Sequence, residues 1–336
     1  MRINHFDTDH KVLVIAEIGN NHEGNYALAE KMIILAAQAG ADAVKFQTIV
    51  PDKLVSPSQK ARMNQLKKFQ LSYKEYEKLS KVAENENVLF FSTPFDIISA
   101  KFLNNLVPAF KISSGDNNFY PLIEQIAQFG KPIILSGGLA DDRQLHYSKL
   151  FIENFWNNLN IKQEIAILHC VSCYPVSPDE ANLSSISRMK HKLKCTIGYS
   201  DHTTGIDASI IAVALGARIV EKHFTIDKNY SDFHDHRLSA DPEEFSRLVN
   251  KIHQTTVLLG NENIEYQPSE KKSFQNIRRS ICASRALPEG SLLQWDDLTW
   301  LRPFCGLSPG NECMVLGKKI SKSINLGESI DINLLN

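Results

Sequence analysis

The segment VLVIAEIGNNHEGNYALAEKMIILAAQAGADAVKFQ, residues 12–47, contains in order an apolar run, a polar turn, a helical pattern and a second apolar run. The runs at 12–18 and 43–47 have the length and apolar character of buried strands. The stretch 25–39 has helical periodicity, and Gly40 ends it because glycine readily takes the left-handed conformation found after helices. The segment therefore predicts a strand–helix–strand unit of the kind that builds parallel sheets.

The same unit recurs along the first part of the chain. Strand-like runs occur at 12–18, 43–47, 88–92, 109–112, 132–136, 165–169, 195–200 and 218–222. The clearest helical patterns are 25–39, 72–84, 120–128, 206–215 and 242–259. Eight such units in about 260 residues predict an α/β fold, a TIM (β/α)8 barrel over residues 1–262. A doubly wound open sheet is the structural alternative.

The character of the sequence changes after Gly260. Residues 263–277 are polar with little apolar periodicity, and we interpret them as a linker. From 278 to 336, short apolar runs alternate with turn residues such as Pro288, Gly290 and Gly310. This part is too short for further β–α units and predicts a small, turn-rich β domain.

Charge and composition exclude several classes of partner. The chain has 37 Lys and Arg against 38 Asp and Glu, so neither nucleic acid nor a membrane surface is an expected partner. No segment has the roughly eighteen uninterrupted apolar residues that span a bilayer, and the first residues lack the apolar stretch of a signal peptide. A cytoplasmic location is expected.

Polar side chains lie at or just after the predicted strands. In a TIM barrel the carboxyl ends of the strands meet at one mouth, where the active site lies. The candidates there include Glu17, Glu23, Lys45, Gln47, Thr93, Phe95, Lys111, Ser114, Asp116, Ser136, Ser172, Tyr174 and Ser200. Two lysines with hydroxyls and glycine-bearing turns suit a phosphate and a carboxylate, the anionic groups of phosphoenolpyruvate.

Two histidines follow the last two predicted strands. His202 comes after the seventh strand and His223 after the eighth, and these strands are neighbours in a barrel. Both imidazoles could bind one divalent cation and leave positions open for water and substrate. Such an ion polarises an aldehyde as a Lewis acid. The spacing of the two residues does not by itself distinguish metal ligands from core or surface histidines.

At these residues the sequence resembles the sialic acid synthase family, which includes N-acetylneuraminate, legionaminic acid and pseudaminic acid synthases. The matching segments are AEIGNNHEG (16–24), KFQT (45–48), FSTPF (91–95), KISSGD (111–116), GYSDHT (198–203) and EKHFT (221–225). Residues 278–336, including Arg302 and Pro303, resemble the antifreeze-like (SAF, β-clip) domain that closes these enzymes.

The resemblance implies a transferase that condenses phosphoenolpyruvate with N-acetylmannosamine or a related 2-acetamido hexose. The reaction releases phosphate and gives a nine-carbon 3-deoxy keto acid for cell-surface polysaccharides. The implied cofactor is a divalent metal, Mn²⁺ with Mg²⁺ or Co²⁺ as alternatives, held by His202 and His223. The implied assembly is a domain-swapped homodimer in which Arg302 enters the active site of the partner.

The resemblance also assigns roles to the remaining candidates. Phosphoenolpyruvate is expected at Lys45, Thr93, Lys111, Ser114, Ser136, Ser172, Tyr174 and Ser200. The acceptor sugar is expected at Glu23, Gln47, Phe95, Asp116, Asp235 and Arg302. Glu23 would contact the acceptor or transfer a proton, and it joins the two lysines and two histidines as the expected catalytic residues.

Departures from the family pattern leave the acceptor open. Many relatives have a Pro-Gly-Pro-Asp turn after the last strand, whereas this chain reads YSDFHD at 230–235 and is one residue longer there. The acceptor is therefore N-acetylmannosamine or a 6-deoxy diacetamido hexose. Two alternatives remain: another phosphoenolpyruvate-dependent 3-deoxy sugar acid synthase, and a catalytically silent sugar-binding homologue.

Overall fold

The computed structural model describes residues 1–261 and 263–336, which form two compact units, Met1–Gly260 and Asn261–Asn336. Residue 262, the predicted end of the barrel domain, lies outside the described residues. Residues 263–277, interpreted from sequence as a linker, contain two short helices, α12 (Pro268–Lys271) and α13 (Phe274–Ile277).

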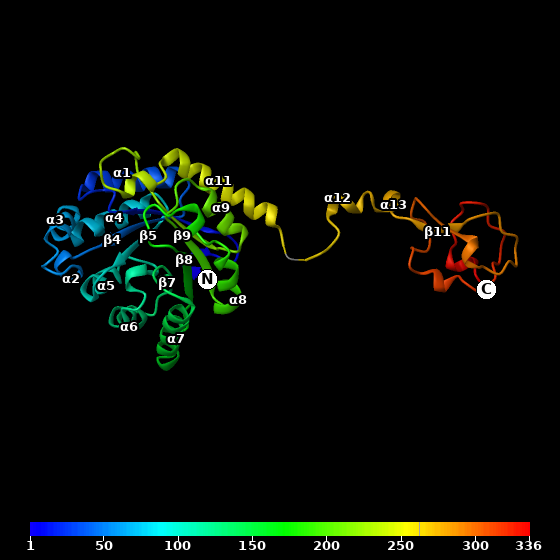
Figure 1. Cartoon of the computed structure of the whole chain (residues 1–336), viewed down its shortest axis with the longest axis horizontal. Coiled ribbons are helices and arrows are strands. Elements are labelled where there is room, and N and C mark those ends of the chain that lie inside the picture. Colours follow the sequence, from blue (N-terminus) through cyan, green and yellow to red (C-terminus); the bar gives the residue numbers. More distant parts are fainter. Residues whose placement is uncertain (262) are drawn as a thin grey trace. The chain divides into compact units, whose positions relative to one another are not determined.

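The first unit is built on eight parallel strands surrounded by helices (Figure 1). The strands are β3 (Leu13–Gly19), β4 (Ala43–Thr48), β5 (Leu89–Pro94), β6 (Phe110–Ile112), β7 (Ile133–Ser136), β8 (Ile165–Cys170), β9 (Thr196–Asp201) and β10 (Ile219–His223). Each predicted strand agrees with the observed one to within two residues.

The order of these strands distinguishes a barrel from a doubly wound sheet. Hydrogen bonds connect them in the order β5-β4-β3-β10-β9-β8-β7-β6, and the two end strands, β5 and β6, contact each other. Each strand therefore lies beside its neighbours in the chain, and the last pairs with the first. A doubly wound sheet reverses direction at a switch point, and this order has none. The arrangement fits a TIM (β/α)8 barrel.

Helices outside the sheet connect successive strands. They are α1 (Tyr26–Gln38), α4 (Tyr73–Asn85), α5 (Ile97–Leu103), α6 (Tyr120–Gln128), α7 (Asp142–Asn158), α8 (Ser185–Leu193), α9 (Asp207–Ala214) and α11 (Pro242–Leu259). The five helices predicted with bounds are present. The eight predicted units also imply helices after the third, fifth and sixth strands, and α5, α7 and α8 lie there. Three further helices lie in the same connections: α2 (Pro51–Leu54) and α3 (Lys60–Phe69) after β4, and α10 (Asp235–Leu238) after β10.

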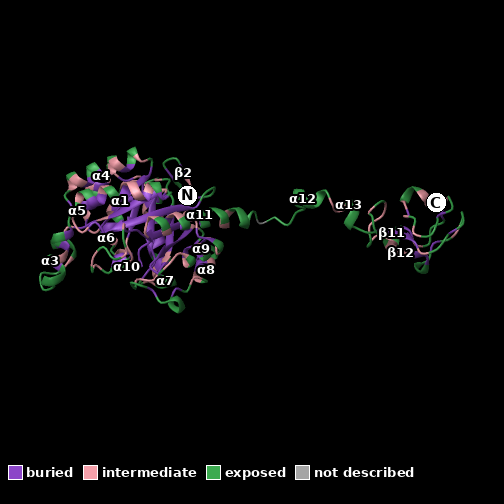
Figure 2. Cartoon of the chain, turned by 90° about the horizontal axis from the view of Figure 1, so that it is seen from above, coloured by how far each residue is buried: buried purple, intermediate pink, exposed green. Residues whose placement is uncertain are grey.

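Alternation along the strands places a polar mouth above an apolar interior. In β3, Leu13 and Ile15 belong to the cluster inside the barrel, whereas Val14 and Ala16 pack in the larger cluster between sheet and helices. Towards the carboxyl end the inward position is polar, as at the buried Glu17. Figure 2 shows the buried strands and the exposed outer faces of the helices. Apolar side chains therefore fill the interior of the barrel, and polar side chains lie at the carboxyl ends of its strands.

The amino ends of the strands are covered by a short hairpin, β1 (Arg2–Ile3) and β2 (Phe6–Asp7). Ile3 and Phe6 from this hairpin join the inner apolar cluster. Within the described part of the chain, no helix is both long and apolar enough to cross a membrane.

The second unit has its own small core. Strands β11 (Ser280–Ala283) and β12 (Leu298–Leu301) pair antiparallel, and isolated bridges and turns make up much of the remainder. Ile281, Leu293 and Val315 are among the buried residues of its core cluster. The short strands and frequent turns agree with the β character expected from its sequence.

Gly24 is expected to be essential to the stability of the barrel. It has a φ of +80°, and a Cβ there would lie 2.2 Å from the carbonyl oxygen of Lys68 on α3. Gly205 has nearly the same φ, +82°, but nothing lies within 4 Å of its Cβ position. Because both alanines would share the backbone strain and only one would clash, Gly24→Ala should lose about 1–3 kcal/mol more unfolding free energy than Gly205→Ala. Urea unfolding measures both, and equal losses would contradict this packing.

Candidate active site

A cavity of about 370 Å³ opens at the carboxyl ends of the strands. This volume is typical of pockets for small metabolites. All eight strands contribute lining residues. Most of the predicted site residues line it: Lys45, Gln47, Thr93, Phe95, Lys111, Ser114, Asp116, Ser136, Ser172, Tyr174, Ser200, His202 and His223.

Two lysines and two glutamates face one another in this cavity. Nζ of Lys45 lies 2.8 Å from Oε2 of Glu17 and 3.7 Å from Oε2 of Glu221. Nζ of Lys111 lies 3.5 Å from Oε1 of Glu221, which also accepts a hydrogen bond from Oγ of Ser200 at 2.8 Å. All four charged side chains are buried. Because an unpaired buried charge is costly, each of the four depends on the others.

The surroundings shift the pKa values of these four groups in different directions. Burial raises the pKa of Glu17 although Lys45 is adjacent. Burial acts the same way on Glu221, but Lys111 and Lys45 outweigh it and lower its pKa to about 2. Burial lowers the pKa of Lys111, whereas Glu17 and Glu221 outweigh burial at Lys45 and raise its pKa. The charges of Lys45 and Glu221 are therefore firmly held, and those of Lys111 and Glu17 less so.

Hydroxyl groups and a glycine lie beside Lys111. Its Nζ donates to Oγ of Ser136 at 2.7 Å, and the backbone N–H of Gly138 donates to Oγ of Ser114 at 3.2 Å. A Cβ at Gly138 would lie 2.3 Å from Oγ of Ser172 and 2.6 Å from Oγ of Ser114, so a side chain would push both hydroxyls away. Oγ of Ser172 is buried without a hydrogen-bond partner among the described residues. It is free to bind an anionic ligand.

His202 and His223 lie side by side in the same cavity, with ring centroids 5.3 Å apart. Nδ1 of His202 is 2.8 Å from the carbonyl oxygen of Val171, which only accepts hydrogen bonds, so the proton is on Nδ1 and Nε2 keeps its lone pair when the ring is neutral. Burial lowers the pKa of His223 well below its ordinary value, and its buried Nδ1 has no hydrogen-bond partner among the described residues. Each of the two rings can therefore offer a nitrogen lone pair to a cation.

These donors fit a weakly held divalent cation. Across residues 1–261 and 263–336, no group of three or more His, Cys, Asp or Glu side chains is arranged to hold a metal. Two imidazoles leave several coordination positions for water and substrate oxygens. Burial opposes charge on His202, but Cys170 and Val171 outweigh it and raise the pKa. A metal ion that binds Nε2 of His202 would have to displace the proton that this nitrogen carries in the charged ring.

Three predicted site residues do not line the cavity. Oε1 of Glu23 is hydrogen-bonded to Oγ of Ser231 and, at 3.3 Å, to Nε2 of His236. Asp235 is the first residue of α10, and Arg302 follows β12 in the second unit with an exposed side chain. Their roles towards an acceptor stay predictions.

The structure also brings in residues to which sequence reasoning gave no role. Glu17 and Glu221 were visible in the sequence as polar residues at strand ends. Their positions in the strands predict side chains that point inward, as those of Lys45 and Lys111 do, and this could have identified them as ion-pair partners of the lysines. Cys170 lines the cavity with its Sγ 3.8 Å from Nδ1 of His202. Leu54 and Arg62 also line it, from the region of α2 and α3, where the sequence carried no signal.

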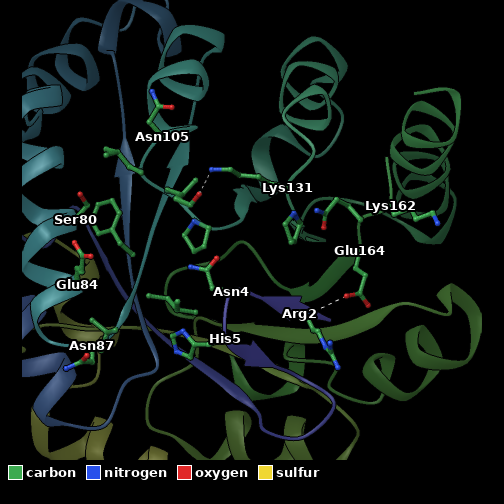
Figure 3. Close-up of a pocket in the computed structure, with 18 residues that line it drawn as sticks. Arg2, Asn4, His5, Ser80, Glu84, Asn87, Asn105, Lys131, Lys162 and Glu164 are labelled. Carbon is green, nitrogen blue, oxygen red and sulfur yellow. Dashed lines mark hydrogen bonds between the residues drawn. The ribbon is translucent and has the colours of Figure 1, made fainter. Parts of the chain in front are cut away.

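A larger hollow of about 1160 Å³ lies at the opposite end of the barrel (Figure 3). There Lys131 donates through Nζ to the carbonyls of Asn104 and Val107, and Glu164 accepts the backbone N–H of Arg2 at 2.9 Å. These groups tie loops together, as expected at the amino ends of TIM-barrel strands. The cavity at the carboxyl ends is therefore the candidate active site.

Comparison with known proteins identifies the family of the chain. The sequence matches the NeuB family over residues 32–264. It is 37% identical to N,N'-diacetyllegionaminic acid synthase of Campylobacter jejuni, over 95% of this chain and 99% of that one. It is 34% identical to pseudaminic acid synthase of Campylobacter jejuni, over 98% of each chain. The crystal structure of N-acetylneuraminic acid synthetase from Leptospira borgpetersenii superposes with a TM-score of 0.74 at 36% identity, over 78% of this chain and 90% of that one. The chain therefore belongs to the NeuB family, the sialic acid synthase family that its strand-end motifs resemble.

Proposed function

We propose that the chain is a nonulosonic acid synthase, which condenses phosphoenolpyruvate with a 2-acetamido hexose and releases phosphate. The observation that carries this proposal is that buried Lys45 and Lys111 share one cavity with His202 and His223. An anionic donor and a divalent cation can therefore occupy the same site. The relatives named as legionaminic and pseudaminic acid synthases support the assignment.

The lysines and hydroxyls would hold the donor. Lys45 and Lys111 supply positive charge for its phosphate and carboxylate, and Ser114, Ser136 and Ser172 supply hydrogen bonds without adding charge. Because Glu221 stays ionised between the two lysines, it keeps both ammonium groups in place before the donor arrives. The chain thus contributes preorganised charge rather than a covalent step.

In the proposed reaction, C3 of phosphoenolpyruvate bonds to the aldehyde carbon of the acceptor, and the aldehyde oxygen takes a proton and becomes a hydroxyl. Water adds at C2, and phosphate leaves with its bridging oxygen, so a keto group remains. Of the two protons that the water gives up, one balances the proton taken by the aldehyde oxygen and the other leaves on the phosphate. A divalent ion on His202 and His223, proposed as Mn²⁺ with Mg²⁺ or Co²⁺ as alternatives, would polarise the aldehyde. The cavity holds donor and acceptor in one orientation.

The acceptor is proposed to be a 2-acetamido hexose, either N-acetylmannosamine or a 6-deoxy diacetamido hexose. Gln47, Phe95 and Asp116 line the cavity and would contact it. We further propose that the second unit is an antifreeze-like (SAF) domain and that Arg302 reaches the active site of a partner in a domain-swapped homodimer. A cytoplasmic location completes the proposal.

A panel of acceptors tests the proposed function. Each reaction would contain phosphoenolpyruvate, Mn²⁺ and one of N-acetylmannosamine, a 2,4-diacetamido-6-deoxy hexose or arabinose 5-phosphate. We expect phosphate release with an acetamido sugar and a nine-carbon keto acid by mass spectrometry. Turnover with arabinose 5-phosphate alone would indicate a different sugar acid synthase. Binding without turnover for every sugar would indicate a silent homologue.

His223→Ala should abolish most metal-dependent turnover without unfolding the chain. Loss of one of two imidazoles removes a ligand and with it the polarisation of the aldehyde, so we expect at least about a 100-fold fall in kcat/KM. His191→Ala, on the exposed side of α8, is the matched control and should keep full turnover. In buffer containing Mn²⁺, turnover of His223→Ala equal to that of the parent protein would refute the role.

Lys111→Met should weaken the binding of phosphoenolpyruvate. Loss of a charge-assisted hydrogen bond predicts roughly a 10- to 100-fold rise in the Kd for phosphoenolpyruvate, measured by isothermal titration calorimetry. Lys131→Met is the control, because burial also lowers the pKa of Lys131, but that residue lies in the hollow at the other end of the barrel. Equal affinities in the two variants would exclude Lys111 from the donor site.

A further inference from the structure

Strands β9 and β10 carry a buried ion pair directly beside the histidines. Asp201 and Lys222 are paired residues of the two strands, and Nζ of Lys222 lies 3.3 Å from Oδ2 of Asp201. Both side chains have 0% exposure. In the sequence Asp201 immediately precedes His202, and Lys222 immediately precedes His223. Neither member of the pair lines the cavity, so neither is placed to meet substrate.

The same two residues also hold the chain beyond His202. Oδ1 of Asp201 accepts hydrogen bonds from the backbone N–H of Thr203 at 2.8 Å and from its hydroxyl at 2.7 Å. Oδ2 accepts from Oγ of Ser209, on α9, at 2.7 Å. Nζ of Lys222 donates to the carbonyl of Thr203 at 2.5 Å. The residues before and after His202 are therefore both fixed to Lys222.

Strand geometry links this pair to the direction of the imidazoles. Successive side chains of a strand point to opposite faces, so anchoring residues 201 and 222 outside the barrel wall directs residues 202 and 223 inward. Since no group of three or more His, Cys, Asp or Glu side chains among the described residues is arranged to hold a metal, the site depends on how these two imidazoles are held. A buried ion pair is a weak source of net stability, since burying its charges costs about as much as their attraction returns. Positioning accounts for its presence better than stability does.

We infer that Asp201 and Lys222 are positioning residues that set the separation and orientation of His202 and His223 for one divalent cation. This inference rests on the proposed function, because the cation is part of that proposal. Groups that orient metal ligands without touching the metal typically change metal affinity 10- to 100-fold when removed. A purely structural pair would instead lower stability and leave the affinity of the folded protein unchanged.

Electron paramagnetic resonance with Mn²⁺ separates these two roles. The signal of free Mn²⁺ gives the Kd, and the spin-echo modulation of bound Mn²⁺ reports how many imidazole nitrogens it contacts. We expect two nitrogens in the parent protein. Lys222→Met and the double variant Lys222→Met with Asp201→Asn should bind Mn²⁺ about 10- to 100-fold more weakly and lose coupling to one imidazole. Ile123→Ala, which truncates a buried side chain on α6, is the destabilised control and should keep both properties.

A milder variant covers the case in which the lysine variants do not fold. Ser209→Ala removes one hydrogen bond to Asp201 and should weaken Mn²⁺ binding about 2- to 10-fold. Parental affinity and two-nitrogen coupling in the folded variants would overturn the inference while leaving the proposed function intact. Equal weakening in Ile123→Ala would also overturn it, as a stability effect. A parent protein that binds no Mn²⁺ would overturn the metal site and the inference together.

Discussion

Two buried lysines and two buried glutamates pair at the mouth of the barrel, and their pairing requires the strands of the first unit to keep their register. Lys45, Lys111, Glu17 and Glu221 are buried at distances at which each needs the others. Such a group is tolerated only when the strands that carry it keep their register, because a shift of one residue would turn every side chain to the other face. The apolar layer below and the helices outside hold that register. Packing therefore keeps the four charged side chains together in the cavity before any ligand binds.

The same strands serve two purposes through their two faces. On the inner face, β9 and β10 present Ser200 and Glu221 and lead to the two histidines. On the outer face, Asp201 and Lys222 join the strands and reach α9. At the end of each of these strands, one residue therefore faces the cavity and the residue beside it joins the strand to its neighbours. The amino ends of the strands carry neither role, and there Ile3 and Phe6 of the hairpin pack into the inner apolar cluster.

Much of the barrel follows from local sequence, and much of the site does not. Strand positions were predictable because buried parallel strands are continuous apolar runs, and four of the five helices predicted with bounds had a clear end because a glycine follows them. The bounds of α7 were not predicted because its polar and aromatic content hides the periodicity. Thirteen predicted site residues share the cavity, since strand ends converge by topology. Glu23 lies instead against Ser231 and His236, a contact between distant segments that no local pattern encodes.

The central claim is that one cavity holds a divalent cation on His202 and His223 and phosphoenolpyruvate on Lys45 and Lys111. Diffraction from crystals containing Mn²⁺ and phosphoenolpyruvate, recorded at the manganese absorption edge, tests it most directly. The account predicts one anomalous peak within bonding distance of both imidazoles, with the phosphate and carboxylate against the two lysines. A peak held by other residues, or phosphoenolpyruvate bound away from the lysines, would contradict it.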